Sequence, residues 1–206
     1  GPLDISEDDA WSFSCWFKGT KTESGGESEH ACILWAENGI SDFSNKLRIG
    51  INNNSSGTPI GGIFYSDARA SSAERVIFTD NATATSGTQY NDGVWRHLTL
   101  TRAAGVDNQT LKCYMNGVEL TNTFDVDGNG ITPIADPVWL TSGTAYRIGC
   151  EVDDDGSGDI DYTDFFKGNI SDMAWWDVAL TAAQVRENMG PGLDLNNLST
   201  EANIVA

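Results

Sequence analysis

Basic residues are scarce in this 206-residue sequence: 12 Lys and Arg stand against 30 Asp and Glu, which gives a formal net charge of −18. Nucleic acids and anionic membrane surfaces are bound through clustered Lys and Arg side chains, so this composition argues against both kinds of partner. Long apolar runs are also lacking, since none approaches the roughly 18 residues of a membrane-spanning helix. The sequence therefore predicts no nucleic-acid partner and no membrane insertion.

Motifs of common catalytic and phosphate-binding sites are missing as well. Only two histidines occur: His30 ends the polar segment 19–30, and His97 lies in a strand-like run. The sequence contains no Gly-x-Ser-x-Gly nucleophile turn and no Gly-x-x-x-x-Gly-Lys phosphate loop. We therefore expect that the protein is not an enzyme.

Cysteine is sparse, and its spacing excludes familiar metal and redox motifs. Cys15, Cys32, Cys113 and Cys150 form no Cys-x-x-Cys pair, which argues against zinc and thioredoxin-type sites. Three of them lie inside apolar strand-like runs, so buried free thiols are the simplest interpretation. One or two disulfides remain the alternative, because spacing alone does not choose among the pairings.

Short alternating segments separated by Gly, Asn, Asp and Ser dominate the rest of the chain. In Trp11–Phe17 apolar and polar residues alternate with the period of a strand. Apolar residues make up 39% of the sequence, which is enough for a core and argues against disorder. Further strands are predicted over 31–36, 46–51, 60–65, 74–79, 94–102, 110–116, 137–141, 145–151 and 166–177. This spacing is typical of an all-β sandwich or barrel.

One helix is predicted near the C-terminal end. Thr181 is placed to cap residues 182–189, with Gln184 at the third position of a capping box and Gly190 followed by Pro191 as a stop. We expect a single domain over 1–206. Residues 1–2 read as a tag remnant, and 190–206 read as an irregular tail leading to a removed neighbouring domain.

Several motifs occur in the order found in a known fold family. They are Trp11–Lys18, Asp92–Arg102, Leu111–Val118, Tyr146–Gly149, Phe166–Asp172 and Trp176–Leu180. Together they resemble the laminin-G-like jelly-roll domains of the concanavalin A-like lectin/glucanase superfamily. The resemblance implies an all-β fold: a two-sheet antiparallel β-sandwich (jelly roll) with one short C-terminal helix. It also implies a structural role for His97.

The resemblance leaves function open, because this fold hosts lectins, adhesion modules, hydrolases and structural proteins. Glucanases of the superfamily carry catalytic carboxylates at alternating positions of one strand, where they act as nucleophile and acid. The nearest pattern here is Glu151-Val-Asp153, which leads directly into an acidic loop. Glycoside hydrolysis is therefore the least favoured function.

That acidic loop, residues 153–164, fits the twelve-residue pattern of an EF-hand calcium loop. Gly158 stands at the sharp turn, and Ile160 stands at the apolar eighth position. The predicted Ca²⁺ ligands are Asp153, Asp155, Ser157, Asp159, Asp161 and Asp164. The flanks look like strands rather than helices, so a solvated acidic hairpin tip is the alternative.

A second acidic loop matches the pattern more loosely. Its predicted calcium ligands are Asp125, Asp127, Asn129 and Asp136, but Pro133 interrupts the spacing beyond the turn. A simple Asp-Gly-Asn-Gly turn is the alternative. Both loops follow strand-like segments, so they could neighbour each other at one end of the sandwich.

Aromatic side chains on outward-facing strand positions are candidates for stacking against a sugar. The ligand-binding candidates are Trp16, Tyr114 and Trp176, although tryptophans in a sandwich mostly belong to the core. Alternation sends Trp175 and Trp176 to opposite faces, so that one lies in the core and the other covers the helix or the second face. We therefore expect a non-catalytic, calcium-associated binding module. Its partner would be a carbohydrate or cell-surface receptor, and it would belong to an extracellular adhesin or a virion surface protein. The alternative is a structural domain of a viral capsid or fibre that contacts a homo-oligomer or neighbouring domains.

Overall fold

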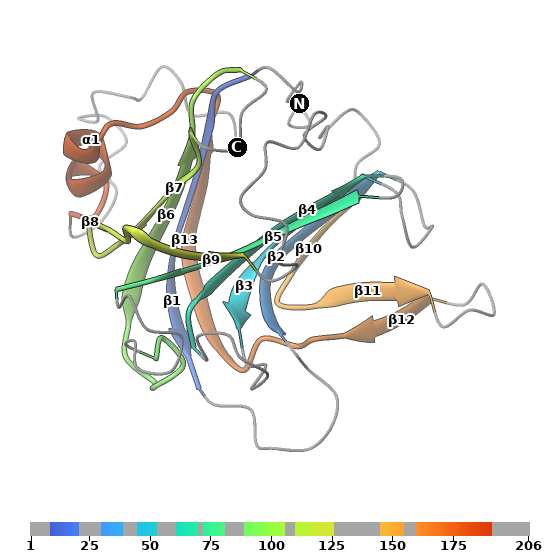
Figure 1. The fold of residues 1–206 in the computed structure, drawn as a ribbon. Coiled ribbons are helices and arrows are strands. Elements are labelled where there is room, and N and C mark those ends of the chain that lie inside the picture. The colour runs from blue at the N-terminus through green and yellow to red at the C-terminus, as the bar shows by residue number, and fades with distance from the viewer. Residues whose placement is uncertain are drawn as a thin grey trace.

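Two antiparallel sheets face each other in the computed structural model, which describes residues 9–20, 30–38, 45–52, 61–69, 72–80, 89–105, 110–125, 145–154 and 160–190 (Figure 1). The five-stranded sheet has the order β13 (Gly168–Trp176), β1 (Trp11–Gly19), β6 (Arg96–Arg102), β7 (Lys112–Met115) and β8 (Val118–Glu119). The six-stranded sheet has the order β10 (Ala145–Ile148), β2 (His30–Asn38), β3 (Asn45–Asn52), β4 (Ile63–Arg69), β5 (Ser72–Thr79) and β9 (Asn122–Asp125). The predicted two-sheet antiparallel β-sandwich is confirmed.

Alternation along β1 explains how the sheets pack. Trp11, Phe13, Cys15 and Phe17 are at most 4% exposed and lie in the core between the sheets. The intervening positions, among them Trp16, face away from this core. Burying large apolar side chains on one face of each sheet supplies the main stabilisation of such a sandwich.

Most predicted strands agree with observed ones, but β8, β9 and β12 were not predicted, and one predicted strand is divided in two. The segment 145–151 was expected to be a single strand, but β10 ends at Ile148 and a separate strand, β11 (Glu151–Asp154), follows. Gly149 lies between them with φ of 82°, a left-handed conformation that glycine adopts at little cost. The chain therefore leaves the six-stranded sheet at this point. The predicted strand 137–141 lies outside the described residues.

Strand β11 pairs with β12 (Ile160–Thr163) to form a two-stranded hairpin. Figure 1 shows this hairpin projecting from the sandwich on the side away from the helix. Its base is tied to β2, because the Cys32 amide donates to the Asp164 carbonyl over 2.9 Å. The acidic loop predicted over 153–164 is thus flanked by a strand on each side.

Helix α1 (Ala182–Glu187) covers part of the outer face of the five-stranded sheet. Thr181 and Gln184 form the predicted capping box. Val185 and Leu180 pack with Tyr114 and Trp176 in a small apolar cluster. The helix therefore turns part of an outward-facing sheet surface into a second core.

All four cysteines are free thiols, and three of them are buried. Burial raises the pKa of the Cys15 thiol, so this group stays protonated and unreactive. Among the described residues, no helix is both long enough and apolar enough to span a bilayer.

Candidate functional site

The hairpin β11–β12 brings two predicted calcium ligands opposite each other. Asp153 and Asp161 are register partners, as are Val152 and Tyr162. Directly opposite positions of antiparallel strands place Cβ atoms about 5 Å apart, and like charges there repel. Two of the predicted calcium ligands therefore occupy opposite backbone positions of the hairpin.

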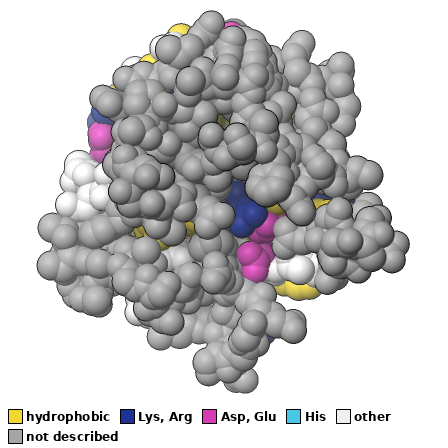
Figure 2. Space-filling view, turned by 45° about the vertical axis from the view of Figure 1, so that its right-hand side comes forward, with side chains coloured by type: hydrophobic (Ala, Val, Ile, Leu, Met, Phe, Trp, Pro, Cys, Tyr) yellow, Lys and Arg dark blue, Asp and Glu magenta, His cyan; other side chains and the backbone are white. Residues whose placement is uncertain are grey.

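A buried ion pair lies at the base of this hairpin. The Glu151 carboxylate on β11 contacts the Arg48 guanidinium on β3, and their side chains are 2% and 20% exposed. The Arg48 guanidinium carbon also lies 4.9 Å from the centre of the Trp35 ring. In Figure 2, basic and acidic side chains lie side by side near the centre of the face viewed. Arg48 therefore connects the hairpin to the outer face of the six-stranded sheet.

The apolar side of this base is formed by Cys32, Trp35 and Val152, which pack together. Burial is the main cause that raises the pKa of the Cys32 thiol, and the negative charges of Glu151 and Asp164 add to it. A neutral thiol is a small apolar group, so Cys32 contributes packing rather than chemistry. We name Arg48, Glu151, Trp35, Cys32 and Val152 the hairpin-base cluster.

The described residues test the predicted EF-hand ligands only in part. Both flanks of the loop are strands, as the alternative interpretation expected, so the helix–loop–helix setting is absent. Asp164 has a φ of 48° and lies against β2 through its carbonyl, beyond the end of β12. The remaining predicted ligands, Asp155, Ser157 and Asp159, lie outside the described residues. Within the described part of the chain, no group of three or more His, Cys, Asp or Glu residues is arranged to hold a metal.

The second acidic loop does not start beside the first. Asp125 ends β9, where it pairs with Val76, and β9 and β10 are the opposite edges of the six-stranded sheet. Four strands separate these edges, and neighbouring strands lie about 4.8 Å apart. The hairpin follows β10, so the described ends of the two loops lie far apart, contrary to our expectation. Asp127, Asn129 and Asp136 lie outside the described residues.

Of the three aromatic candidates, only Trp16 keeps an accessible side chain. Tyr114 is 3% exposed and Trp176 is 0% exposed, because α1 packs over them. Alternation predicted that Tyr114 faces outward and that one of Trp175 and Trp176 lies in the core while the other covers the helix or the second face. It did not show that the helix region also covers Tyr114. Trp16 is half-buried and lies edge-on to His97, with 5.3 Å between ring centres and a 63° interplanar angle. The structure thus corrects the expectation that Tyr114 and Trp176 line an open surface.

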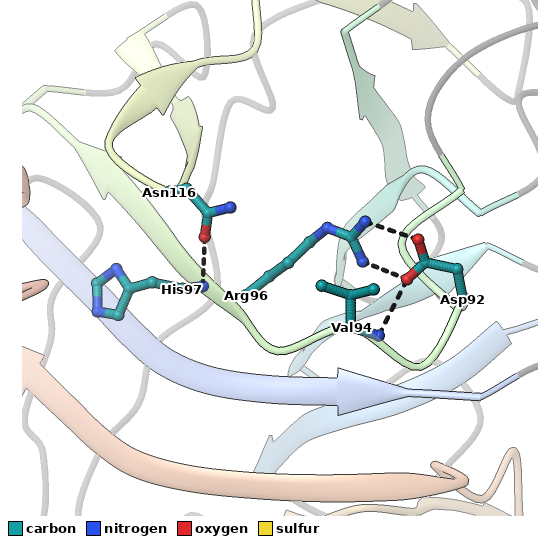
Figure 3. Close-up of polar contacts among 5 residues, drawn as sticks. All are labelled: Asp92, Val94, Arg96, His97 and Asn116. Carbon is teal, nitrogen blue, oxygen red and sulfur yellow. Dashed lines mark hydrogen bonds and ion pairs between the residues drawn. The ribbon is translucent and has the colours of Figure 1, made fainter.

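His97 itself is buried and held in place. Its amide donates to Asn116 Oδ1 over 2.9 Å, as drawn in Figure 3, and its Nδ1 lies 3.4 Å from Thr99 Oγ1. Burial lowers the pKa of His97 to about 4, and the negative charge of Asp172 acts in the opposite direction. The ring is therefore neutral at neutral pH, in keeping with the structural role that the family resemblance implies.

The sequence analysis missed an exposed aromatic residue at the start of β6. Trp95 is 44% exposed and its neighbour Val94 is 52% exposed. The turn that carries them is fixed by Asp92, which accepts from the Val94 amide over 3.1 Å and pairs with Arg96 (Figure 3). Alternation within a strand does not show whether an apolar residue directly before that strand is exposed.

Comparison with known proteins identifies the fold family. A family model described as the concanavalin A-like lectin/glucanases superfamily matches residues 2–186. The chain belongs to this superfamily. A comparison with curated protein sequences gives no match.

Several solved structures share the architecture at low sequence identity. The heptameric SAP-like pentraxin of Limulus polyphemus is 18% identical with a TM-score of 0.54, and the match covers 90% of this chain and 72% of that one. The CBM40 domain of the Ruminococcus gnavus IT-sialidase is 16% identical with a TM-score of 0.52, and the match covers 89% and 84%. The binding domain of botulinum neurotoxin serotype G is 13% identical with a TM-score of 0.53, and the match covers 90% and 37%. At these identities the likeness concerns the fold.

Proposed function

We propose that this chain is a non-catalytic carbohydrate-binding module whose hairpin β11–β12 binds Ca²⁺ next to the ligand. The observation that carries the proposal is the register of Asp153 with Asp161 above the hairpin-base cluster. Structures of the same fold support the ligand class, since the Ruminococcus gnavus CBM40 domain was solved with α2,3- and α2,6-sialyllactose. A location outside the cell or on a virion surface is part of the proposal.

Calcium fits the chemistry of the hairpin. A divalent cation relieves the repulsion between carboxylate-bearing residues at opposite strand positions, and Ca²⁺ takes six to eight oxygen ligands. Asp153 and Asp161 would hold the ion together with oxygens from the connecting residues 155–159. Bound Ca²⁺ offers coordination positions for sugar hydroxyls, and it lowers the net negative charge that a ligand meets.

In this proposal, side chains of the hairpin-base cluster make polar contacts to the sugar. Arg48 is one-fifth exposed, and a guanidinium has five N–H donors, so its pairing with Glu151 leaves donors for sugar hydroxyls or a carboxylate. Glu151 is the first carboxylate of the Glu151-Val-Asp153 pattern and is bound to Arg48. A glycosidase acid must carry a proton toward the glycosidic oxygen, and a carboxylate held in an ion pair is kept ionised. This pairing supports binding rather than hydrolysis.

The test combines thermal melting with a glycan array, each with Ca²⁺ and with chelator. Because the ion binds the folded state, Ca²⁺ raises Tm in the wild type, and the double variant Asp153→Asn/Asp161→Asn loses most of this shift. Asp177→Asn, an exposed acidic residue after β13, is the matched control and keeps the full shift. Glycan binding is expected in Ca²⁺ and is weaker in chelator.

Two results would contradict the proposal. A hairpin double variant with the full calcium shift in Tm would remove Asp153 and Asp161 from the site. An array without a bound glycan in either condition would reject carbohydrate as the ligand class and leave the structural capsid or fibre domain as the better account.

A further inference from the structure

The part of the five-stranded sheet that α1 does not cover carries exposed aromatic and basic side chains. Tyr114 and Trp176 lie under the helix at one end of this outer face. At the other end, where β1 ends and β6 begins, lie Trp16, Lys18 and Trp95. This end belongs to a different sheet from the hairpin-base cluster.

Register and alternation place Lys18 and Trp95 together. The β1–β6 ladder pairs Trp16 with His97 and ends with Phe17 opposite Arg96, and the two segments meet again where Thr20 bridges to Asp92. Lys18 directly follows Phe17 and Trp95 directly precedes Arg96, so both residues lie on neighbouring segments at this end of the sheet. Phe17 is fully buried in the core, so the neighbouring Lys18 lies on the outer face. On its other side Lys18 pairs with Asn169, which is exposed on β13. The three residues therefore lie on neighbouring segments at the same end of the sheet.

Trp95 stands on a rigid turn. Arg96 binds both oxygens of the Asp92 carboxylate, and the Gly93 amide donates to the Gly19 carbonyl over 2.7 Å. An indole carried by a fixed turn loses less conformational entropy on binding a ligand than one carried by a mobile segment. Because 44% of Trp95 is exposed, a ring face or edge is available to a ligand.

Two lysines lie at this end of the sheet in an otherwise acidic protein. The Thr20 amide donates to the Lys167 carbonyl over 2.8 Å, which fixes the backbone of Lys167 beside the end of β1. Lys167 is exposed and Lys18 is half-buried. The nearest acidic residue of the turn, Asp92, is already neutralised by Arg96. More distant carboxylates are screened, since the Debye length at physiological salt is about 8 Å.

Asp172 limits the direction in which an acidic ligand can extend. This exposed carboxylate on β13 acts on His97, which lies under Trp16. Negative charge of the ligand is therefore unfavourable at the Trp16 end and favourable at the Lys18–Lys167 end.

We propose that Trp95, Lys18 and Lys167 form a second, calcium-independent subsite for an acidic sugar. The indole stacks on the pyranose ring, and the lysines bind its anionic group, either a carboxylate or a sulfate. The inference rests on the proposed function in one respect, namely that carbohydrate is the ligand class.

Titration calorimetry in the presence of chelator tests the subsite. The probes are an oligogalacturonate for the carboxylate, a sulfated dextran oligomer for the sulfate, and maltohexaose as the neutral reference. The wild type is expected to bind at least one acidic probe tenfold or more tightly than maltohexaose. Trp95→Ala and Lys18→Gln/Lys167→Gln each lower that affinity at least tenfold, whereas Trp95→Phe retains part of it. Lys112→Gln, an exposed lysine on β7, is the matched control and binds as the wild type does.

The outcomes separate this inference from the calcium proposal. Acidic-probe binding in chelator that survives both Trp95→Ala and Lys18→Gln/Lys167→Gln, or that equals maltohexaose binding, would overturn the subsite. If the subsite fails while Asp153→Asn/Asp161→Asn still abolishes calcium-dependent glycan binding, the proposed function stands alone. If chelator-resistant binding depends on Trp95 and Ca²⁺ has no effect on Tm, the subsite stands and the calcium site is rejected. Melting curves of each variant confirm folding before affinities are compared.

Discussion

Arg96 and Asp92 lie four residues apart and form a two-pronged ion pair, with Nη1 2.5 Å from Oδ1 and Nη2 2.8 Å from Oδ2. Hydrogen bonding by Arg96 is the main cause that lowers the pKa of Asp92 to about 2. Arg96 is 8% exposed and its guanidinium carbon lies 5.3 Å from the centre of the Tyr90 ring. The pair therefore closes the end of the core and fixes the turn that carries Trp95.

We expect Asp92→Asn to destabilise the fold by about 1 kcal/mol. The variant leaves the largely buried Arg96 without a carboxylate, but Asp92 is 42% exposed and solvent screens part of the pair. Urea denaturation measures the change. Asp177→Asn removes the same charge from an exposed position and should stay within about 0.5 kcal/mol of the wild type. Equal stability of the two variants would show that the pair contributes nothing.

His97 makes stability depend on pH in a defined window. Its pKa is about 4 in the folded protein and ordinarily 6.5, so the unfolded chain binds the proton more tightly. Stability therefore falls as the pH drops from about 6.5 to about 4, by a few kcal/mol at most, because one pKa unit corresponds to about 1.4 kcal/mol. Above pH 6.5 the ring is neutral in both states and contributes no pH dependence.

The variant His97→Gln isolates this effect from the titration of the many carboxylates. The stability difference between wild type and variant, measured by urea denaturation between pH 4 and 8, should be constant above pH 6.5 and shift in favour of the variant below it. A difference that does not change with pH would mean that His97 titrates normally in the fold.

Gly168 is required where β13 begins. Its φ is 153°, and a Cβ there would lie 1.9 Å from the Lys18 carbonyl oxygen. Gly168→Ala therefore forces β1 and β13 apart at their first pair, and we expect a loss of about 3 kcal/mol. Gly105 is the control: its φ is 114°, and an added Cβ meets no atom within 4 Å. Gly105→Ala should lower the stability only through backbone strain, by about 1 kcal/mol. If thermal melting showed similar losses of stability for Gly168→Ala and Gly105→Ala, the steric argument would be wrong.

The Arg48–Glu151 pair should show strong coupling. Arg48→Met leaves the Glu151 carboxylate, whose side chain is 2% exposed, buried without its cation, and we expect a loss of about 3 kcal/mol. Arg48→Met/Glu151→Leu removes both charges and should recover most of that loss. A double-mutant cycle by urea denaturation measures the coupling. Additive effects would show that the two side chains act independently.

The fold was predictable because its signals are local. Alternation in Trp11–Phe17 separates core from surface positions within a single strand. The capping box at Thr181 likewise involves only residues that are close together in the sequence. The break at Gly149 was missed because Tyr146, Ile148 and Cys150 alternate as in one strand, and only the left-handed φ of Gly149 marks the turn between β10 and β11. Whether the chain turns at Gly149 depends on the strands with which β10 and β11 pair.

The candidate site was predictable only in part, since its geometry depends on distant segments. Asp153 and Asp161 were selected by spacing, but their opposition arises from strand pairing rather than from a helical calcium loop. Glu151 meets Arg48 on a strand about 100 residues earlier, and no local pattern reveals that partner. Tyr114 was correctly placed on an outer face, and a position against the helix was one alternative for one of Trp175 and Trp176. That the later segment α1 also covers Tyr114 was not evident from alternation.

The left-handed turn at Gly149 also has a consequence for how this domain can vary. Among the described strands, β11 and β12 pair with each other and with no third strand, while the backbone bond from Cys32 to Asp164 anchors their base. The hairpin can therefore be lengthened, shortened or exchanged between relatives without changing the register of either large sheet. The hairpin is therefore a position at which a new recognition loop can be grafted while the two large sheets stay unchanged.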